Sequence, residues 1–127
     1  MKQIIQHPLI VISGPAGVGK TTVAKALLKT YPELRTSVTY TTRRKREHST
    51  EDKKMYYVTR EEFEQKRENG EFLESAEVHG DLYGTHRRET EDEFAKGPML
   101  FNIDVQGAEQ LKALYGGRVV TIFLLPE

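Results

Sequence analysis

The sequence predicts an α/β protein whose core is a parallel sheet flanked by helices. Three short apolar stretches, rich in β-branched residues, stand at residues 8–13, 98–105 and 118–127. Each is apolar at consecutive positions, which is typical of a strand that is buried on both faces. Helical patterns lie between these stretches, and strands that alternate with helices favour a parallel sheet.

The first quarter of the chain predicts a strand, a tight loop and a helix, in that order. Pro8 and Gly14 bound the first apolar stretch. Over residues 20–31 the apolar side chains recur at the spacing of one helix face, and Pro32 ends this pattern.

Residues 35–96 have a different character, because they are charged and rich in β-forming residues. Thr59 and Glu62 form a capping-box pattern that predicts the start of a helix, and Gly70 predicts its end. The other elements expected here are an extended segment at 35–42, a strand at 55–59, an alternating segment at 71–80, a turn at 81–85 and a short polar helix at 87–97. A last helix is predicted at 107–117, where a Gly-Gly pair ends it.

The segment GPAGVGKT at residues 14–21 fits the pattern G-x-x-x-x-G-K-[ST] of a phosphate-binding loop. Its glycines let the backbone curl so that N–H groups point at phosphate oxygens, and the following helix adds its positive end. Lys20 is predicted to reach the β- and γ-phosphates of ATP, and Thr21 to offer its hydroxyl to Mg²⁺. The predicted ATP-binding residues are Gly14, Pro15, Ala16, Gly17, Val18, Gly19, Lys20, Thr21 and Thr22.

Composition limits the other functions that the chain could have. The 127 residues are 37% hydrophobic and 30% charged with a formal net charge of zero, which is typical of one globular domain without a basic field for nucleic acid. The chain has no cysteine, so disulfides and thiolate metal sites are excluded. The N-terminus lacks the unbroken apolar region of a signal peptide, and no apolar run is long enough to span a bilayer. We therefore expect a cytoplasmic protein without membrane or nucleic-acid partners.

Three further motifs follow the phosphate loop: SVTYTTRRKRE, GEFLESAEVHGDLYGT and FNIDVQG. In this order and spacing they resemble the guanylate kinase family over nearly the whole chain. The resemblance implies in-line transfer of a phosphoryl group from ATP to GMP, with Mg²⁺. It also implies a division of the chain, with residues 1–34 and 97–127 forming an incomplete phosphate-loop core and residues 35–96 forming an inserted GMP-binding segment.

The resemblance implies a role for each residue that matches a family motif. Arg43 and Arg46 match two arginines that hold the acceptor phosphate, a task that suits the planar guanidinium fork. Glu74 matches a carboxylate that accepts hydrogen bonds from guanine N1–H and the exocyclic amine, which adenine cannot supply. The implied GMP-binding residues are Thr39, Arg43, Arg46, Glu74, Tyr83, Thr85 and Asp104, and the implied catalytic residues are Lys20, Arg43 and Arg46.

Three substitutions depart from the family pattern. Lys45 stands where the family usually has a proline, so the loop loses a fixed φ angle. Met55 stands at a tyrosine that touches the acceptor phosphate, and Tyr56 is one residue late, which in a strand points the side chain to the other face. Asn102 replaces an acidic residue, so Mg²⁺ binding should weaken there. From residue 47 to Met55 we expect disorder, or a contact that differs from the family's.

The family continues beyond the position of Glu127 with an arginine-bearing lid, a further strand and a C-terminal helix. We therefore expect this chain alone to bind acceptor nucleotide better than it turns it over. We also expect residues 118–124 to form an exposed edge strand through which the chain could form a homo-oligomer.

Two alternatives to a GMP kinase remain open from the sequence. A guanylate-kinase-like module that binds a protein partner typically has an eroded phosphate loop, whereas this loop is intact. A related small-metabolite kinase on the same fold would keep the phosphate loop and take a different acceptor, which Glu74 and the arginines argue against.

Overall fold

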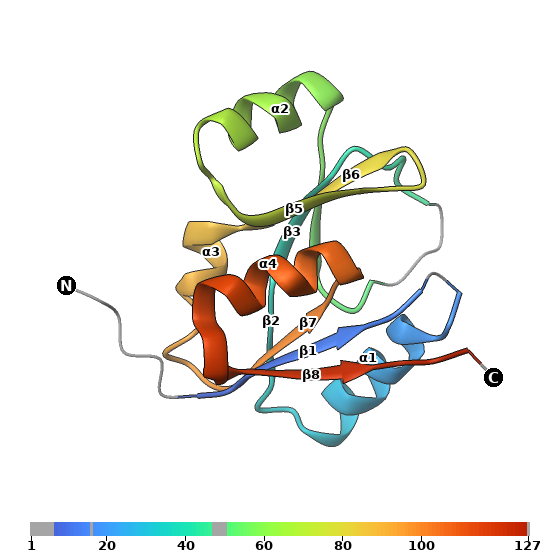
Figure 1. Cartoon of the computed structure of the whole chain (residues 1–127), viewed down its shortest axis with the longest axis vertical. Coiled ribbons are helices and arrows are strands. Elements are labelled where there is room, and N and C mark those ends of the chain that lie inside the picture. Colours follow the sequence, from blue (N-terminus) through green and yellow to red (C-terminus); the bar gives the residue numbers. More distant parts are fainter. Residues whose placement is uncertain (1–6, 16, 47–50, 127) are drawn as a thin grey trace.

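The computed structural model describes residues 7–15, 17–46 and 51–126, which form two four-stranded sheets (Figure 1). The core sheet has the strand order β2-β7-β1-β8, and the second sheet has the order β4-β3-β6-β5. In Figure 1 the core sheet lies in the lower half and the second sheet in the upper half. Within the described residues, no helix is long and apolar enough to cross a membrane.

The core sheet is entirely parallel, as the sequence predicts. It contains β2 (Arg35–Thr36), β7 (Met99–Asn102), β1 (Leu9–Ser13) and β8 (Val119–Phe123), and β1 pairs with both β7 and β8. Two helices, α1 (Lys20–Thr30) and α4 (Val105–Tyr115), follow β1 and β7. They lie on opposite sides of the sheet in Figure 1, which makes this half a three-layer α/β structure.

The apolar residues of the core strands pack on both faces of the sheet. On one face Leu9 and Val11 belong to a cluster with Leu111 of α4, and on the other Ile12 packs with Ala24 of α1. All five side chains are fully buried. Burial of such a side chain stabilises the fold by about 1.5–3 kcal/mol, so the consecutive apolar positions are explained by the two helices.

The second sheet combines parallel and antiparallel pairs. It contains β4 (Lys54–Tyr57), β3 (Val38–Thr41), β6 (Asp81–His86) and β5 (Phe72–Val78). Strand β3 is parallel to β4 and antiparallel to β6, which is in turn antiparallel to β5. The α2 helix (Arg60–Glu68) packs Phe63 against Phe72 with ring centroids 4.6 Å apart. The predicted capping box is confirmed, because Thr59 and Glu62 bond reciprocally at the start of α2.

The predicted turn at residues 81–85 is wrong, because these residues belong to β6. The turn lies two residues earlier, at His79 and Gly80, where φ is 51° and 85°. Val78 pairs with Asp81 across it, so this is a two-residue hairpin loop with positive φ at both central residues. Gly84 is a strand residue because the Phe72 ring occupies the place of its side chain: an added Cβ would lie 2.9 Å from the ring.

Other predicted boundaries shift by a few residues. The segment at 35–42 is divided between the two sheets, with buried Ser37 at the crossing. The polar helix α3 (Arg87–Glu91) ends earlier than the predicted residue 97. Helix α4 begins at Val105 instead of residue 107 because the side chain of Asp104 caps it, and a short 3₁₀ helix (Gly116–Arg118) precedes β8.

Candidate active site

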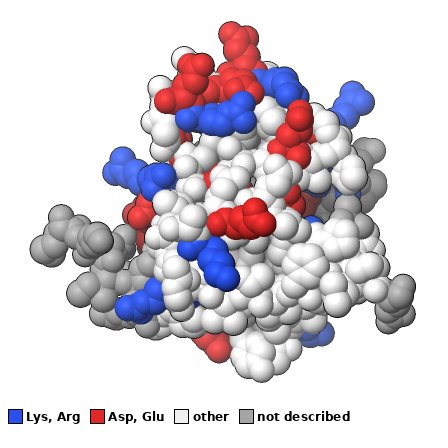
Figure 2. Space-filling model, viewed as in Figure 1, with Lys and Arg blue, Asp and Glu red and all other residues white. Residues whose placement is uncertain are grey.

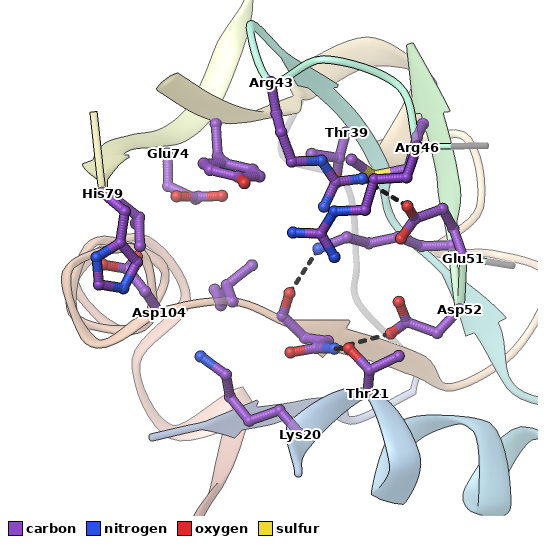
Figure 3. A pocket seen from close by; sticks show the side chains of 16 residues that line it. Lys20, Thr21, Thr39, Arg43, Arg46, Glu51, Asp52, Glu74, His79 and Asp104 are labelled. Carbon is purple, nitrogen blue, oxygen red and sulfur yellow. Dashed lines mark hydrogen bonds and ion pairs between the residues drawn. The ribbon is translucent and has the colours of Figure 1, made fainter. Parts of the chain in front are cut away.

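A cavity of about 270 Å³ lies between the two sheets, at the carboxyl ends of β1 and β7. Figure 3 shows Glu74, His79 and Asp104 at one end, Arg43, Arg46 and Glu51 at the other, and Lys20 and Thr21 along one side. Of the residues that the sequence predicts for the site, the cavity is lined by Lys20, Thr21, Thr39, Arg43, Arg46, Glu74, Tyr83, Asn102 and Asp104.

The phosphate loop connects β1 to α1 in a tight curl. Gly14, Gly17 and Gly19 have φ angles of 144°, 81° and 96°, and a Cβ on Gly14 would lie 2.6 Å from the carbonyl oxygen of Leu124. Gly14 therefore serves both the curl and the close approach of the chain after β8. The Lys20 ammonium donates to the Gly14 carbonyl at 2.8 Å, and its burial lowers its pKa.

Among the described residues, three other predicted loop residues do not line the cavity: Pro15, Val18 and Thr22. Val18 donates its N–H to the Pro15 carbonyl at 3.4 Å, which closes the turn of the loop. Thr22 is exposed on the first turn of α1. Ala16 lies outside the described residues.

Glu74 is a buried carboxylate at the end of the cavity away from the arginines. It is 5% exposed, and Thr85 donates its hydroxyl to Glu74 Oε1 at 2.5 Å. Desolvation raises the pKa of Glu74 to about 7, although the Thr85 hydrogen bond opposes this rise. Thr85 does not line the cavity, so its hydroxyl positions Glu74. Gly107 permits the arrangement, because a Cβ there would collide with the Glu74 carboxylate.

Thr39 and Asp104 are two other polar residues that line the cavity. The Thr39 hydroxyl is buried and has no hydrogen-bond partner among the described residues, although Thr39 lines the cavity. A buried polar atom without a partner is uncommon, and a ligand is one of its explanations. Asp104 caps α4 by accepting the N–H of Gly107 at 3.1 Å, so its carboxylate is fixed at the cavity wall. Tyr83 of β6 also lines the cavity.

Arg43 is held by an acidic partner that the sequence analysis did not identify. Its guanidinium donates to Glu51 at 2.5 Å and to the Tyr57 hydroxyl at 3.2 Å. Burial alone would raise the pKa of Glu51, but the bonds from Arg43 and Tyr57 lower it, so its carboxylate is charged at neutral pH. Arg44, Lys45 and Arg46 are all exposed, and of these three only Arg46 lines the cavity.

Asn102 connects the phosphate loop to a second unpredicted acid. Its side-chain amide donates to Asp52 Oδ2 at 3.0 Å and to the Thr21 hydroxyl at 3.3 Å (Figure 3). A carboxylate therefore lies beside Thr21, although strand β7 itself carries the neutral Asn102. Among the described residues, no group of three or more His, Asp or Glu side chains is arranged to hold a metal ion by itself.

Residues 51–53, directly before β4, make specific contacts. For the segment from residue 47 to Met55 the sequence predicts either disorder or a contact that differs from the family's. Residues 47–50 lie outside the described residues, but Lys53 donates its ammonium to the Asn102 carbonyl at 2.6 Å. Met55 lines the cavity, while Tyr56 points to the other face of the sheet and stacks on Tyr40 with centroids 4.9 Å apart. Tyr56 therefore does not face the cavity, in agreement with the prediction that its side chain points to the other face of the strand. The sequence analysis did not assign Glu51, Asp52 and Lys53 to the site, and the high charge of this segment was the only signal that could have indicated them.

The parallel sheet, the phosphate loop at its edge and the adjoining polar cavity define a P-loop nucleotide-binding protein. The family model described as "Guanylate kinase" matches residues 6–127. Curated guanylate kinases of Geobacter metallireducens and Rhizobium meliloti are each 45% identical to this chain over 93% of its length. A crystal structure of guanylate kinase from Anaplasma phagocytophilum matches with a TM-score of 0.77 and 38% identity, covering 94% of this chain and 60% of that one.

The chain belongs to the guanylate kinase family. It spans 58% and 54% of the length of the two curated relatives, so it corresponds to somewhat more than half of their sequence.

Proposed function

We propose that this chain binds GMP and ATP in the cavity and transfers the γ-phosphoryl group of ATP to GMP. The observation that carries the proposal is the position of one buried carboxylate, Glu74, in the same cavity as Arg43, Arg46 and Lys20. The carboxylate is at one end and the arginines are at the other (Figure 3). The cavity is therefore acidic at one end and basic at the other. A nucleotide whose base donates hydrogen bonds and whose phosphate is negatively charged matches these two ends.

At the base end, Glu74 would accept hydrogen bonds from guanine N1–H and the exocyclic amine. These bonds need the ionised carboxylate, whereas burial raises the pKa of Glu74 to about 7. Guanine would therefore displace a proton from Glu74 as it binds. The Thr39 hydroxyl, which has no hydrogen-bond partner among the described residues, and the Asp104 carboxylate would be further partners for the nucleoside. Thr85 would support the site through its bond to Glu74.

At the phosphate end, Arg43, Arg46 and the Tyr83 hydroxyl would hold the acceptor phosphate. Lys20 and the backbone N–H groups of residues 14–22 would hold the phosphates of ATP. No side-chain nucleophile is needed, because catalysis of phosphoryl transfer is positioning together with stabilisation of the negative charge that develops. Lys20 would leave the Gly14 carbonyl, to which it now donates, and turn to the β- and γ-phosphates.

The residues near Thr21 fit a magnesium ion bound together with ATP. Mg²⁺ prefers hard oxygen ligands and usually keeps several waters beside substrate phosphates. Thr21 supplies a hydroxyl oxygen and Asp52 supplies a carboxylate. The side-chain amide of Asn102 donates hydrogen bonds to both of them. When bound, the ion would neutralise charge on the transferring phosphoryl group. Asn102 lacks the charge of an acid, so we propose that it orients Thr21 and Asp52.

A single set of measurements tests the proposed function. Calorimetry measures GMP binding, and a coupled assay measures ADP formation from ATP with GMP, AMP, CMP or UMP as acceptor. GMP-dependent turnover, or tight GMP binding with slow turnover, supports the proposal. Binding of no nucleotide would refute it and favour a protein-binding module, while turnover with another acceptor alone would favour a different small-metabolite kinase.

We further propose that residues 1–34 and 97–127 act as the ATP-binding core and residues 35–96 as the acceptor-binding segment. The two-residue strand β2 (Arg35–Thr36) lies within residues 35–96 but pairs with β7 of the core sheet. We also propose that the chain acts in the cytoplasm, where both substrates occur.

Figure 2 shows acidic and basic side chains intermingled over the upper part of this face, without a large area of one sign.

Among the strands that the structure describes, β8 pairs with β1 alone and stands at the edge of the core sheet. Val120, Ile122 and Phe123 are 52%, 40% and 50% exposed. Exposed apolar edge strands pair readily with other strands. We therefore propose that residues 118–124 can join two copies of this chain, which light scattering coupled to size-exclusion chromatography would measure.

A further inference from the structure

Lys53 is the one cavity-lining lysine outside the phosphate loop, among the residues that the structure describes. It lies in the loop before β4, on the acceptor side of the chain, yet its ammonium donates to the Asn102 carbonyl at 2.6 Å, at the end of core strand β7. The side chain therefore crosses from one half of the molecule to the other. The neighbouring Lys54 is exposed to solvent, whereas the Lys53 side chain is partly buried and turned into the cavity.

Charges of both halves surround the ammonium group of Lys53. Asp52, Glu74 and Glu51 stabilise its positive charge, while Lys20 of the phosphate loop opposes it. Burial lowers the pKa of Lys53, so the fold accepts a cost in free energy by keeping an ammonium here. An ammonium has three N–H donors, and the Asn102 carbonyl is the only hydrogen-bond acceptor it reaches among the described residues.

The neighbouring phosphate-binding groups leave a place for another donor. Met55 presents a thioether to the cavity, and a thioether has no N–H or O–H to donate. Arg43 is already engaged by Glu51 and Tyr57, so its guanidinium is shared between these oxygens and any ligand. Some donors of Arg43 are therefore used by Glu51 and Tyr57, and a second cation close to Arg43 would add donors for a bound anion.

We propose that Lys53 binds the phosphate of the acceptor nucleotide together with Arg43 and Arg46. This inference rests on the proposed function and adds a phosphate-binding residue to it. The bond to Asn102 fixes the ammonium at the boundary between the acceptor and donor halves, and two of its three N–H donors are left for the acceptor phosphate. A lysine suits this position because it is a compact point charge with three donors in no fixed plane.

The test compares Lys53→Met with Lys54→Met, which removes an equal charge from the exposed neighbour. Calorimetry measures the binding of GMP, guanosine and ATP to the full chain and to each variant. Lys53→Met should weaken GMP binding by about 10- to 100-fold more than it weakens guanosine binding, the effect of one charge-assisted hydrogen bond to phosphate. Guanosine should lose only the contribution that Lys53 makes to the ionisation of Glu74. Lys54→Met should change neither, and Lys53→Arg should keep most of the GMP affinity.

The comparison of GMP with guanosine separates phosphate binding from a structural role. If Lys53 only anchors the loop to β7, Lys53→Met weakens GMP and guanosine alike, and the inference is overturned. A loss of ATP affinity with GMP affinity unchanged would assign Lys53 to the donor phosphates and also overturn it. If the variant binds GMP as the wild type does, this inference alone fails, whereas a wild-type chain that binds no GMP refutes the proposed function itself. If Lys53→Met does not fold, Lys53→Gln with the same ligands gives the answer.

Discussion

Glu74→Gln should stabilise the free protein at neutral and alkaline pH while it damages the site. The native pKa of Glu74 is about 7, against an ordinary value of 4.5, and the main cause is desolvation. Between these values the native state keeps a proton that the unfolded chain has lost, so the free energy of unfolding falls as the pH rises. Above about pH 7, the loss of unfolding free energy caused by the buried, ionised Glu74 is complete. At about 1.4 kcal/mol for each unit of pKa shift, this loss amounts to about 3 kcal/mol.

Glutamine is neutral at every pH, and its side-chain oxygen can still accept the hydroxyl of Thr85. Relative to the wild type, Glu74→Gln should therefore gain stability with pH, and the gap should widen by about 2.5 kcal/mol from about pH 5 to about pH 8. Urea unfolding followed by circular dichroism at several pH values measures this gap. Glu77→Gln on the same strand is the control, because Glu77 is exposed.

A gap that stays constant with pH, or that narrows as the pH rises, would refute the argument that Glu74 is a desolvated carboxylate. The same variant also tests the base-reading role. Glu74→Gln should relax the preference for GMP over AMP, because the amide replaces one acceptor oxygen by an NH₂ donor, which cannot accept a bond from guanine. An equal loss of affinity for all acceptors would contradict that role.

Three further predictions concern the wild-type site and two of its charged residues. Guanosine should bind about tenfold more tightly at about pH 8 than at about pH 6, because only ionised Glu74 accepts the base; a flat profile would contradict this. Arg43→Ala should weaken all nucleoside monophosphates by about 10- to 100-fold in calorimetry, because it removes a charged donor and frees Glu51 to repel phosphate, while exposed Arg44→Ala should have little effect. Asp52→Asn should weaken Mn²⁺ binding in the presence of ATP several-fold, measured by electron paramagnetic resonance, with exposed Asp92→Asn as control and unchanged affinity as the contradicting result.

Local patterns were sufficient to predict most elements that the structure contains. The β1 strand, the glycine-rich loop and α1 depend on residues that are adjacent in sequence, and so does the capping box at Thr59. The hairpin at His79 was misplaced because Gly84 in the segment DLYGT is typical of a turn. The Phe72 ring, twelve positions earlier, is what makes glycine fit a strand there.

The sequence by itself determined the fold class and the phosphate loop, because strand burial and the loop's backbone curl follow from neighbouring residues. It also indicated that Arg43, Arg46 and Glu74 belong to one site, through a resemblance in order and spacing. The tertiary structure alone decided which charges of the segment at 51–53 enter the cavity. Lys53 and Asp52 reach it through Asn102, about fifty residues later in the chain, and no local pattern encodes such a contact. The same is true of the raised pKa of Glu74, which arises from the helix and strands that exclude water around it.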